Sequence, residues 1–213
     1  MIEVKYLLLN LNTDRPVSLG ASPLSLYISS SYQKKFGQSE RPLSGGSYPL
    51  LQYKVIRGAP LIVAINEGCE LLWEIYDNLD EINKNGPYKI LERRIIDRVA
   101  FLGPCESRLK FRFLTPWLAI SEAELNKLKP DPRSLNRVLA GILENNLTML
   151  ARNFQCQLDK PVEVSINIKD ENIVQKDTGI AGLFGTFYTN FEIPQFLSLG
   201  KGVGRGFGTI KQN

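Results

Sequence analysis

The chain has 213 residues, a formal net charge of +4 at pH 7 and a hydrophobic fraction of 43%. This length suits one large domain or two small ones, and the mild positive charge permits an anionic partner. The chain contains no histidine, which excludes Ser-His-Asp and Cys-His catalysis and histidine-ligated metals. Any acid–base chemistry must therefore come from Tyr, Lys, Asp or Glu.

The cysteine pattern predicts free thiols and no structural zinc site. Three cysteines stand far apart, and no Cys-x-x-Cys pair occurs among them. This usage is typical of a reducing compartment. No apolar stretch approaches the roughly 18 residues of a membrane span, and the first residues show no signal-peptide pattern. We expect a cytoplasmic protein without a metal, a cofactor or a membrane partner.

A strand and a capped helix are predicted at the beginning of the chain. Residues 2–11 form a nearly continuous apolar run, which is typical of a strand in the centre of a sheet. Ser22 precedes Pro23, and this pair is typical of a helix N-terminus. Apolar residues then recur at helical spacing as far as Phe36, and the polar residues 39–47 predict a loop.

The following segments predict a β-hairpin, a second helix and a further strand. The hairpin turns at Gly58-Ala59, and a helical pattern extends from Glu67 to near Asn85. The predicted strands are residues 48–57, 60–66 and 88–101. The order strand, helix, strand, strand, helix, strand is that of a ferredoxin-like domain.

Gly103-Pro104 interrupts this pattern, and we place a domain boundary there, between residues 1–103 and 104–213. The second half contains one long helical pattern at residues 135–154. Its predicted strands are residues 109–113, 162–168, 180–193 and 207–211. A glycine-rich loop stands where the second helix of a ferredoxin-like domain would be. We therefore expect an α+β fold of two tandem ferredoxin-like (RRM-like) domains.

The glycine-rich loop, residues 200–208, is the most unusual stretch of the chain. Glycine occupies every second position, with Lys201 and Arg205 between the glycines. Each glycine costs chain entropy, so such a run suits a backbone that closely approaches an anion. The spacing matches neither a dinucleotide-binding motif nor a Walker loop. We predict that this loop contacts phosphate. The alternative is a flexible tail or an elaborate hairpin turn.

Three stretches resemble one known family. GKGVGRGFGTI at residues 200–210 resembles the glycine-rich signature that closes the CRISPR-associated repeat-RNA endoribonucleases of the RAMP superfamily. YPLLQYK at 48–54 and LIVAINEG at 61–68 look like the central hairpin of one branch of that family. FLTPWLA at 113–119 resembles the first strand of its second domain. The matches lie in the family's order and span nearly the whole chain.

The resemblance implies a protein that binds the repeats of CRISPR precursor RNA and cuts once per repeat. The family uses no metal: the 2′-OH attacks the adjacent phosphate and leaves a 2′,3′-cyclic phosphate and a 5′-OH. The glycine-rich loop of the family faces the first helix across the RNA. Other CRISPR-associated proteins and a second copy of the chain are further partners that the resemblance leaves open.

Members usually place a catalytic histidine in or just after the first helix, and this sequence has none. The catalytic candidates are Tyr32, which with the lysines could move a proton, and Lys34 and Lys35, which could stabilise the phosphorane. The alternatives are a core aromatic for Tyr32 and a solvated helix end for the two lysines. Because the histidine is missing, a non-cleaving RNA-binding protein or ribonucleoprotein subunit of the same fold is the alternative function.

The RNA-binding candidates are cations and the glycines that bring backbone close to phosphate. They are Arg41, Lys54, Gly200, Lys201, Gly202, Gly204, Arg205 and Gly206.

Overall fold

The computed structural model describes residues 1–18, 21–36, 48–83, 87–175 and 180–213. They form two compact units. The N-terminal unit comprises Val4–Ala100 together with Gly204–Gly206. The C-terminal unit comprises Met1–Glu3, Phe101–Val203 and Phe207–Asn213. The middle of the glycine-rich loop thus belongs by its contacts to the N-terminal unit.

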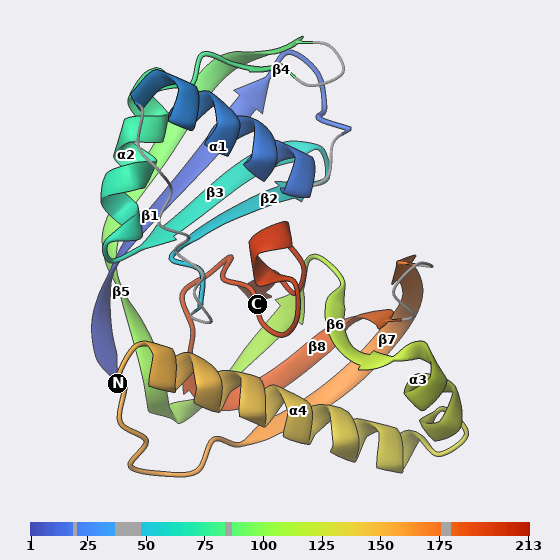
Figure 1. Cartoon of the computed structure of the whole chain (residues 1–213). Helices are drawn as coiled ribbons and strands as arrows, with labels where there is room; N and C mark the ends of the chain where they lie inside the picture. The colour runs from blue at the N-terminus through green and yellow to red at the C-terminus, as the bar shows by residue number, and fades with distance from the viewer. Residues whose placement is uncertain (19–20, 37–47, 84–86, 176–179) are drawn as a thin grey trace. The chain divides into compact units, whose positions relative to one another are not determined.

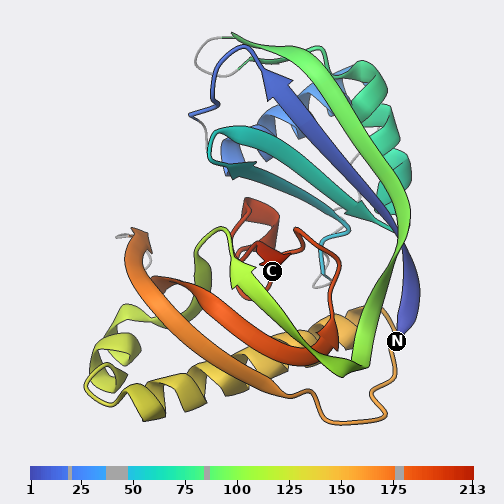
Figure 2. The same ribbon diagram turned by 180° about the vertical axis from the view of Figure 1, so that it is seen from behind.

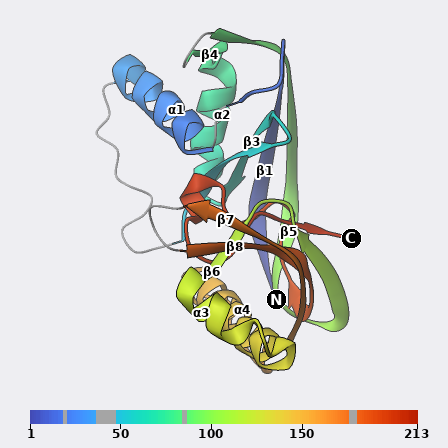
Figure 3. The same cartoon turned by 90° about the vertical axis from the view of Figure 1, so that its right-hand side faces the viewer.

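The N-terminal unit is a β-sheet with two helices on one face. Its strands are β1 (Ile2–Thr13), β2 (Leu51–Ile56), β3 (Ala59–Ile65), the short β4 (Glu81–Asn83) and the first part of β5 (Pro87–Phe113). The order is β2-β3-β1-β5, and β4 pairs with β5. The helices are α1 (Ala21–Phe36) and α2 (Gly68–Asn78), which lie on the same side of the sheet (Figures 1 and 3). This is the ferredoxin-like arrangement expected from the sequence.

The core of this unit lies between the sheet and its helices. Alternate residues of β1, Leu7, Leu9 and Leu11, pack in one cluster with Leu24 of α1 and Leu72 of α2. A strand presents every second side chain to the same face, so the alternation fixes which face of β1 carries the helices.

The β2–β3 hairpin turns at Arg57 and Gly58, whose φ angles are 51° and 80°. Two successive positive φ values are typical of the two-residue turn that matches the twist of antiparallel strands. The predicted hairpin is confirmed, with its turn one residue earlier than expected.

The predicted length of the second helix is wrong. α2 ends at Asn78, because Leu79 adopts an extended conformation with φ −93° and ψ 98°. Ile82, which continued the helical spacing in the sequence, is instead buried in β4. One apolar residue at helical spacing is compatible with a further helical turn and with a short strand that faces the same core. The sequence pattern therefore could not distinguish the two.

The predicted strand end near residue 101 is also wrong, because β5 runs without interruption to Phe113. Gly103 adopts a φ of 131°, and a Cβ there would lie 2.7 Å from the Cys156 sulfur. The pairing of β5 with β8 (Ile180–Glu192) shifts in register between Pro104 and Leu109. The glycine and proline therefore pair inside the strand, with Glu192 and Phe191, and a bulge follows them.

The C-terminal unit is a sheet in which β8 pairs with β5, β6 and β7, while β9 pairs with β5. Its further elements are β6 (Trp117–Ser121), α3 (Glu122–Leu128), α4 (Pro132–Asn153), β7 (Val164–Gln175), the 3-10 turn η1 (Val203–Arg205) and β9 (Ile210–Gln212). In α4, Leu135, Leu139, Leu143, Leu147 and Leu150 are buried. This periodicity was the basis of the predicted long helix.

The short α3 was not predicted, although its sequence holds a start signal. The Ser121 hydroxyl accepts a hydrogen bond from the Glu124 backbone N–H, and the Glu124 carboxylate accepts one from the Ser121 N–H. This reciprocal arrangement is a capping box. α4 begins in a similar way, where the Asp131 carboxylate accepts from the backbone N–H groups of Arg133 and Ser134.

Candidate nucleic-acid interface

The glycine-rich loop is an ordered turn held by backbone hydrogen bonds, which contradicts the flexible-tail alternative. Leu199 donates to the Gly208 carbonyl at 2.9 Å and closes the loop. Lys201 donates to the Leu118 carbonyl at 3.3 Å, and Gly208 donates to the Pro116 carbonyl at 2.8 Å. The loop is therefore docked on the segment that includes the start of β6.

The glycines of this loop do not all serve the same purpose. A Cβ at Gly200, where φ is 86°, would lie 2.6 Å from the Trp117 ring nitrogen. A Cβ at Gly208 would lie 2.0 Å from the Leu199 carbonyl oxygen. These two glycines are required by the fold itself. A Cβ at Gly204 would meet only Pro49, at 3.9 Å, so packing does not explain the absence of a side chain there.

The two cations of the loop are both exposed, as a phosphate contact needs. Lys201 belongs to the C-terminal unit and Arg205 to the N-terminal unit. Lys201 also lies near the Glu124 carboxylate and helps to lower its pKa, after the larger effect of the Ser121 hydrogen bonds. Their assignment to phosphate remains a prediction.

Lys54, an RNA-binding candidate of the sequence, is buried. Its side chain has 0% exposure. Its ammonium nitrogen donates to the Gln52 side-chain oxygen at 2.9 Å, and the Gln52 amide donates to the Pro49 carbonyl at 3.1 Å. Burial lowers the pKa of Lys54 to about 7. A proton-exchanging group that the sequence does not reveal therefore lies inside the N-terminal unit.

The loop backbone lies against this lysine. A Cβ at Gly206 would lie 2.6 Å from the Ala21 Cβ, 3.0 Å from the Tyr53 carbonyl oxygen and 3.6 Å from the Lys54 Cα. Glycine is thus required where the loop meets the start of α1 and the β2 backbone. That the loop faces the first helix across RNA stays a prediction.

The catalytic candidates Tyr32, Lys34 and Lys35 occupy the C-terminal part of α1, and their side chains lie outside the described part of the structure. The two lysines stand in the last turn, where the helix dipole favours cations. Arg41 lies outside the described residues altogether. The assignments of all four remain predictions.

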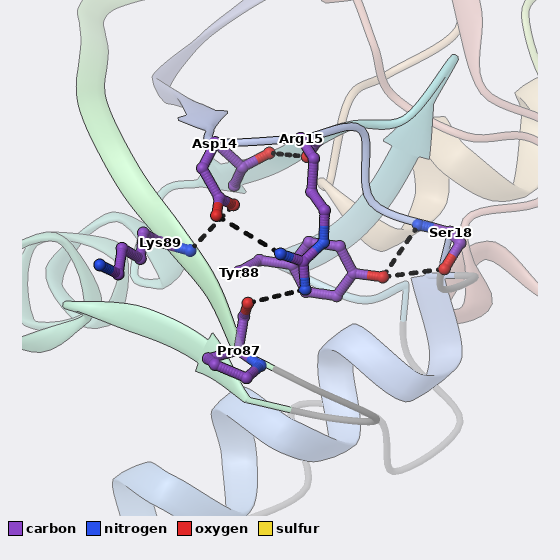
Figure 4. Close-up of polar contacts among 7 residues, drawn as sticks. Asp14, Arg15, Ser18, Pro87, Tyr88 and Lys89 are labelled. Carbon is purple, nitrogen blue, oxygen red and sulfur yellow. Dashed lines mark hydrogen bonds and ion pairs between the residues drawn. The ribbon is translucent and has the colours of Figure 1, made fainter.

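The connection from β1 to α1 is held by a polar cluster (Figure 4). The Tyr88 hydroxyl lies 2.8 Å from the Ser18 hydroxyl oxygen, and the Arg15 guanidinium carbon lies 4.7 Å from the centroid of the Tyr88 ring. Arg15 also donates to the Pro87 carbonyl at 2.9 Å, and the Asp14 carboxylate accepts from the Lys89 N–H at 3.1 Å. These contacts tie the chain that enters α1 to the start of β5.

Within the described ranges, no three Cys, Asp or Glu side chains gather in a way that could hold a metal ion. Among the helices of those ranges, none is both long and apolar enough to cross a membrane.

A tandem ferredoxin-like fold with a docked glycine-rich turn before its last strand defines a protein of the RAMP type. The model of the Cas6b N-terminal domain matches residues 2–99, and that of the Cas6b C-terminal domain matches residues 103–213. The chain belongs to the Cas6b family. The family resemblance and the fold class expected from the sequence are both confirmed.

Solved structures agree with this assignment, and one curated relative is similar to part of the chain. The structure is similar to a crystal structure of Cas6b, with a TM-score of 0.82, 26% identity and full coverage of both chains. It is also similar to the structure of a CRISPR RNA processing endoribonuclease Cas6b, with a TM-score of 0.74, 25% identity and full coverage. An uncharacterized protein of Methanocaldococcus jannaschii is 26% identical over 140 residues, which cover 64% of this chain and 95% of that protein.

Proposed function

We propose that this chain is an endoribonuclease that cleaves CRISPR precursor RNA within its repeats without a metal ion. The 2′-OH of one nucleotide loses its proton to solvent and attacks the adjacent phosphorus. The bond from phosphorus to the 5′-oxygen of the next nucleotide then breaks, and that oxygen takes up a proton. The products carry a 2′,3′-cyclic phosphate and a 5′-OH. The observation that carries the proposal is the Cas6b family match over both halves of the chain.

Lys54 is our candidate for the proton donor in a chain that lacks histidine. A lysine with a pKa of about 7 exchanges its proton near neutral pH, whereas an exposed lysine holds it until about pH 10. A bound phosphate favours the protonated form of the amine. The protonated Lys54 then donates to the leaving 5′-oxygen, and Gln52 orients the amine through the hydrogen bond described above.

Because Lys54 is fully buried, the RNA must gain access to it. The backbone at Gly206 lies against the Lys54 main chain and carries no side chain that would have to be displaced. We propose that Gly204–Gly206 move when the RNA binds, and that Arg205 and Lys201 then contact phosphates. Lys34 or Lys35 stabilises the charge of the phosphorane, which supplies much of the rate in phosphoryl transfer.

The test uses cognate repeat RNA in EDTA, in parallel with RNA that carries a 2′-deoxy sugar at the cleavage position. Cleavage of the first RNA and none of the second is expected. Lys54→Met should lower the single-turnover rate by about 10²–10⁴-fold, as loss of a general acid does. Lys127→Met, on exposed helix α3, is the matched control. In the wild type, kcat/KM should fall as the pH rises through about 7.

A second candidate function is RNA binding without cleavage, which the absence of histidine favours. The same assay separates the two functions. Tight binding of both RNAs with neither cut would reject the endoribonuclease and support the binding protein.

A further inference from the structure

The sheet of the C-terminal unit has one apolar face and one polar face. Phe111 stacks on Phe187 with ring centroids 5.3 Å apart, and Phe113 stacks on Trp117 at 5.2 Å. The Trp117 ring nitrogen donates to the Asn146 side chain of α4 at 3.3 Å. This aromatic face is therefore the one that α4 covers.

The alternate residues of the same strands must point away from α4. Figure 2 views the sheet of this unit with α4 behind β7 and β8. We call the uncovered side the open face. It carries Lys110 and Arg112 of β5, both exposed, and Tyr188 of β8, which is 37% exposed. Lys211 of β9 pairs directly with Arg112 and so lies on the same face.

Two cations lie beside the exposed tyrosine ring. The Arg108 guanidinium carbon is 5.2 Å from the Tyr188 ring centroid, and the Lys110 ammonium nitrogen is 5.5 Å from it. Arg108 also donates to the Ser165 hydroxyl of β7, which pairs opposite Tyr188. The exposed ring thus has two cations next to it on the open face.

The residues of this face that pair next to Tyr188 carry positive charges. Arg112 pairs with Thr186 and with Lys211, and Lys110 pairs with Tyr188. Next to them, Asn167 pairs with Thr186. These partners offer hydroxyl, amide, ammonium or ring groups, and a carboxylate residue, Asp170, follows only further along β7, opposite Phe184. Like charges at such spacing repel one another, and an anionic ligand would relieve the repulsion.

We propose that the open face is an RNA-binding surface for the unpaired nucleotides that flank the cleaved repeat. A base stacks on Tyr188, and Arg108, Lys110, Arg112 and Lys211 contact the phosphates. Aromatic rings surrounded by cations on an open sheet are a general way to hold single-stranded RNA, because every base has a face that can stack. The inference rests on the proposed function only in that CRISPR RNA is the ligand.

The test is fluorescence anisotropy of the full chain with a labelled ten-nucleotide oligouridylate. Tyr188→Ala should weaken binding by about tenfold, as loss of one base-stacking ring does, whereas Tyr188→Phe should keep the affinity. The double variant Lys110→Ala/Arg112→Ala should reduce the slope of log K against log salt by about 1.4. The double variant Arg133→Ala/Arg137→Ala, at two exposed positions near the start of α4, is the charge-matched control and should change neither quantity.

The outcomes separate this inference from the proposed cleavage. Loss of oligouridylate binding in Tyr188→Ala supports the surface, whether or not the chain cuts repeat RNA. The inference would be overturned if Tyr188→Ala, shown by circular dichroism to be folded, bound oligouridylate as tightly as the wild type. This holds even if cleavage of repeat RNA is normal. Equal binding of oligouridylate and polyglutamate would also overturn it, because the surface would then be a general anion site.

Discussion

Replacement of Lys54 by methionine should stabilise the protein in a strongly pH-dependent way. The lysine ionises with a pKa of 10.5 in its ordinary state and about 7 when buried. Between these values the unfolded chain binds a proton that the folded chain lacks, so the stability of the wild type rises with pH. Below pH 7 the wild type carries the full cost of a buried charge, and above pH 10.5 it carries none.

The size of the effect follows from the two pKa values. The cost of ionisation is about 4 kcal/mol at pH 7 and about 2 kcal/mol at pH 9, and it approaches zero above pH 10.5. Methionine carries no charge and has a similar length, so Lys54→Met removes this cost. The variant should gain stability at pH 7 but lose the proposed proton donor. Such a trade-off between stability and activity is common at functional sites.

Urea denaturation of wild type and variant at pH 6, 7, 8 and 9 measures this difference directly. Effects of all other groups cancel when the two free energies of unfolding are subtracted at each pH. Lys127→Met controls for the loss of one positive charge at an exposed site. A difference that stays constant from pH 6 to 9 would refute the argument, because it would show that Lys54 keeps an ordinary pKa in the folded protein.

Further predictions concern the glycine-rich loop and the polar cluster. Gly200→Ala should cost a few kcal/mol in urea denaturation, because its Cβ would overlap the Trp117 ring at a φ of 86°. Gly204→Ala should change stability by less than about 1 kcal/mol, since the space is open. The double variant Lys201→Ala/Arg205→Ala should lower the salt slope of repeat-RNA binding by about one to two, and an unchanged slope would contradict a phosphate role. Tyr88→Phe should cost about 1 kcal/mol of unfolding free energy through the lost hydrogen bond to Ser18; a variant as stable as wild type would show that this bond is not needed.

Much of the fold was predictable because local patterns and packing agree. The nearly continuous apolar run of β1 and the leucine periodicity of α4 both match the residues that are buried. The predictions failed where a local sequence signal was compatible with two different structures. Ile82 fits both a helical turn and a short strand, and Gly103-Pro104 fits both the end of a strand and a paired position inside β5.

The sequence by itself determined the family, the tandem fold and the absence of histidine chemistry, because these depend on residue identity and order. Only the tertiary structure decided that Lys54 is buried, since alternation in a strand shows that two faces differ but not what covers each. It also decided which glycines the loop needs for packing, because those overlaps involve residues distant in the chain, such as Trp117 and Ala21. The open face is a third case: its cations come from β5 and β9 and its tyrosine from β8, and they share one face only when the sheet has formed.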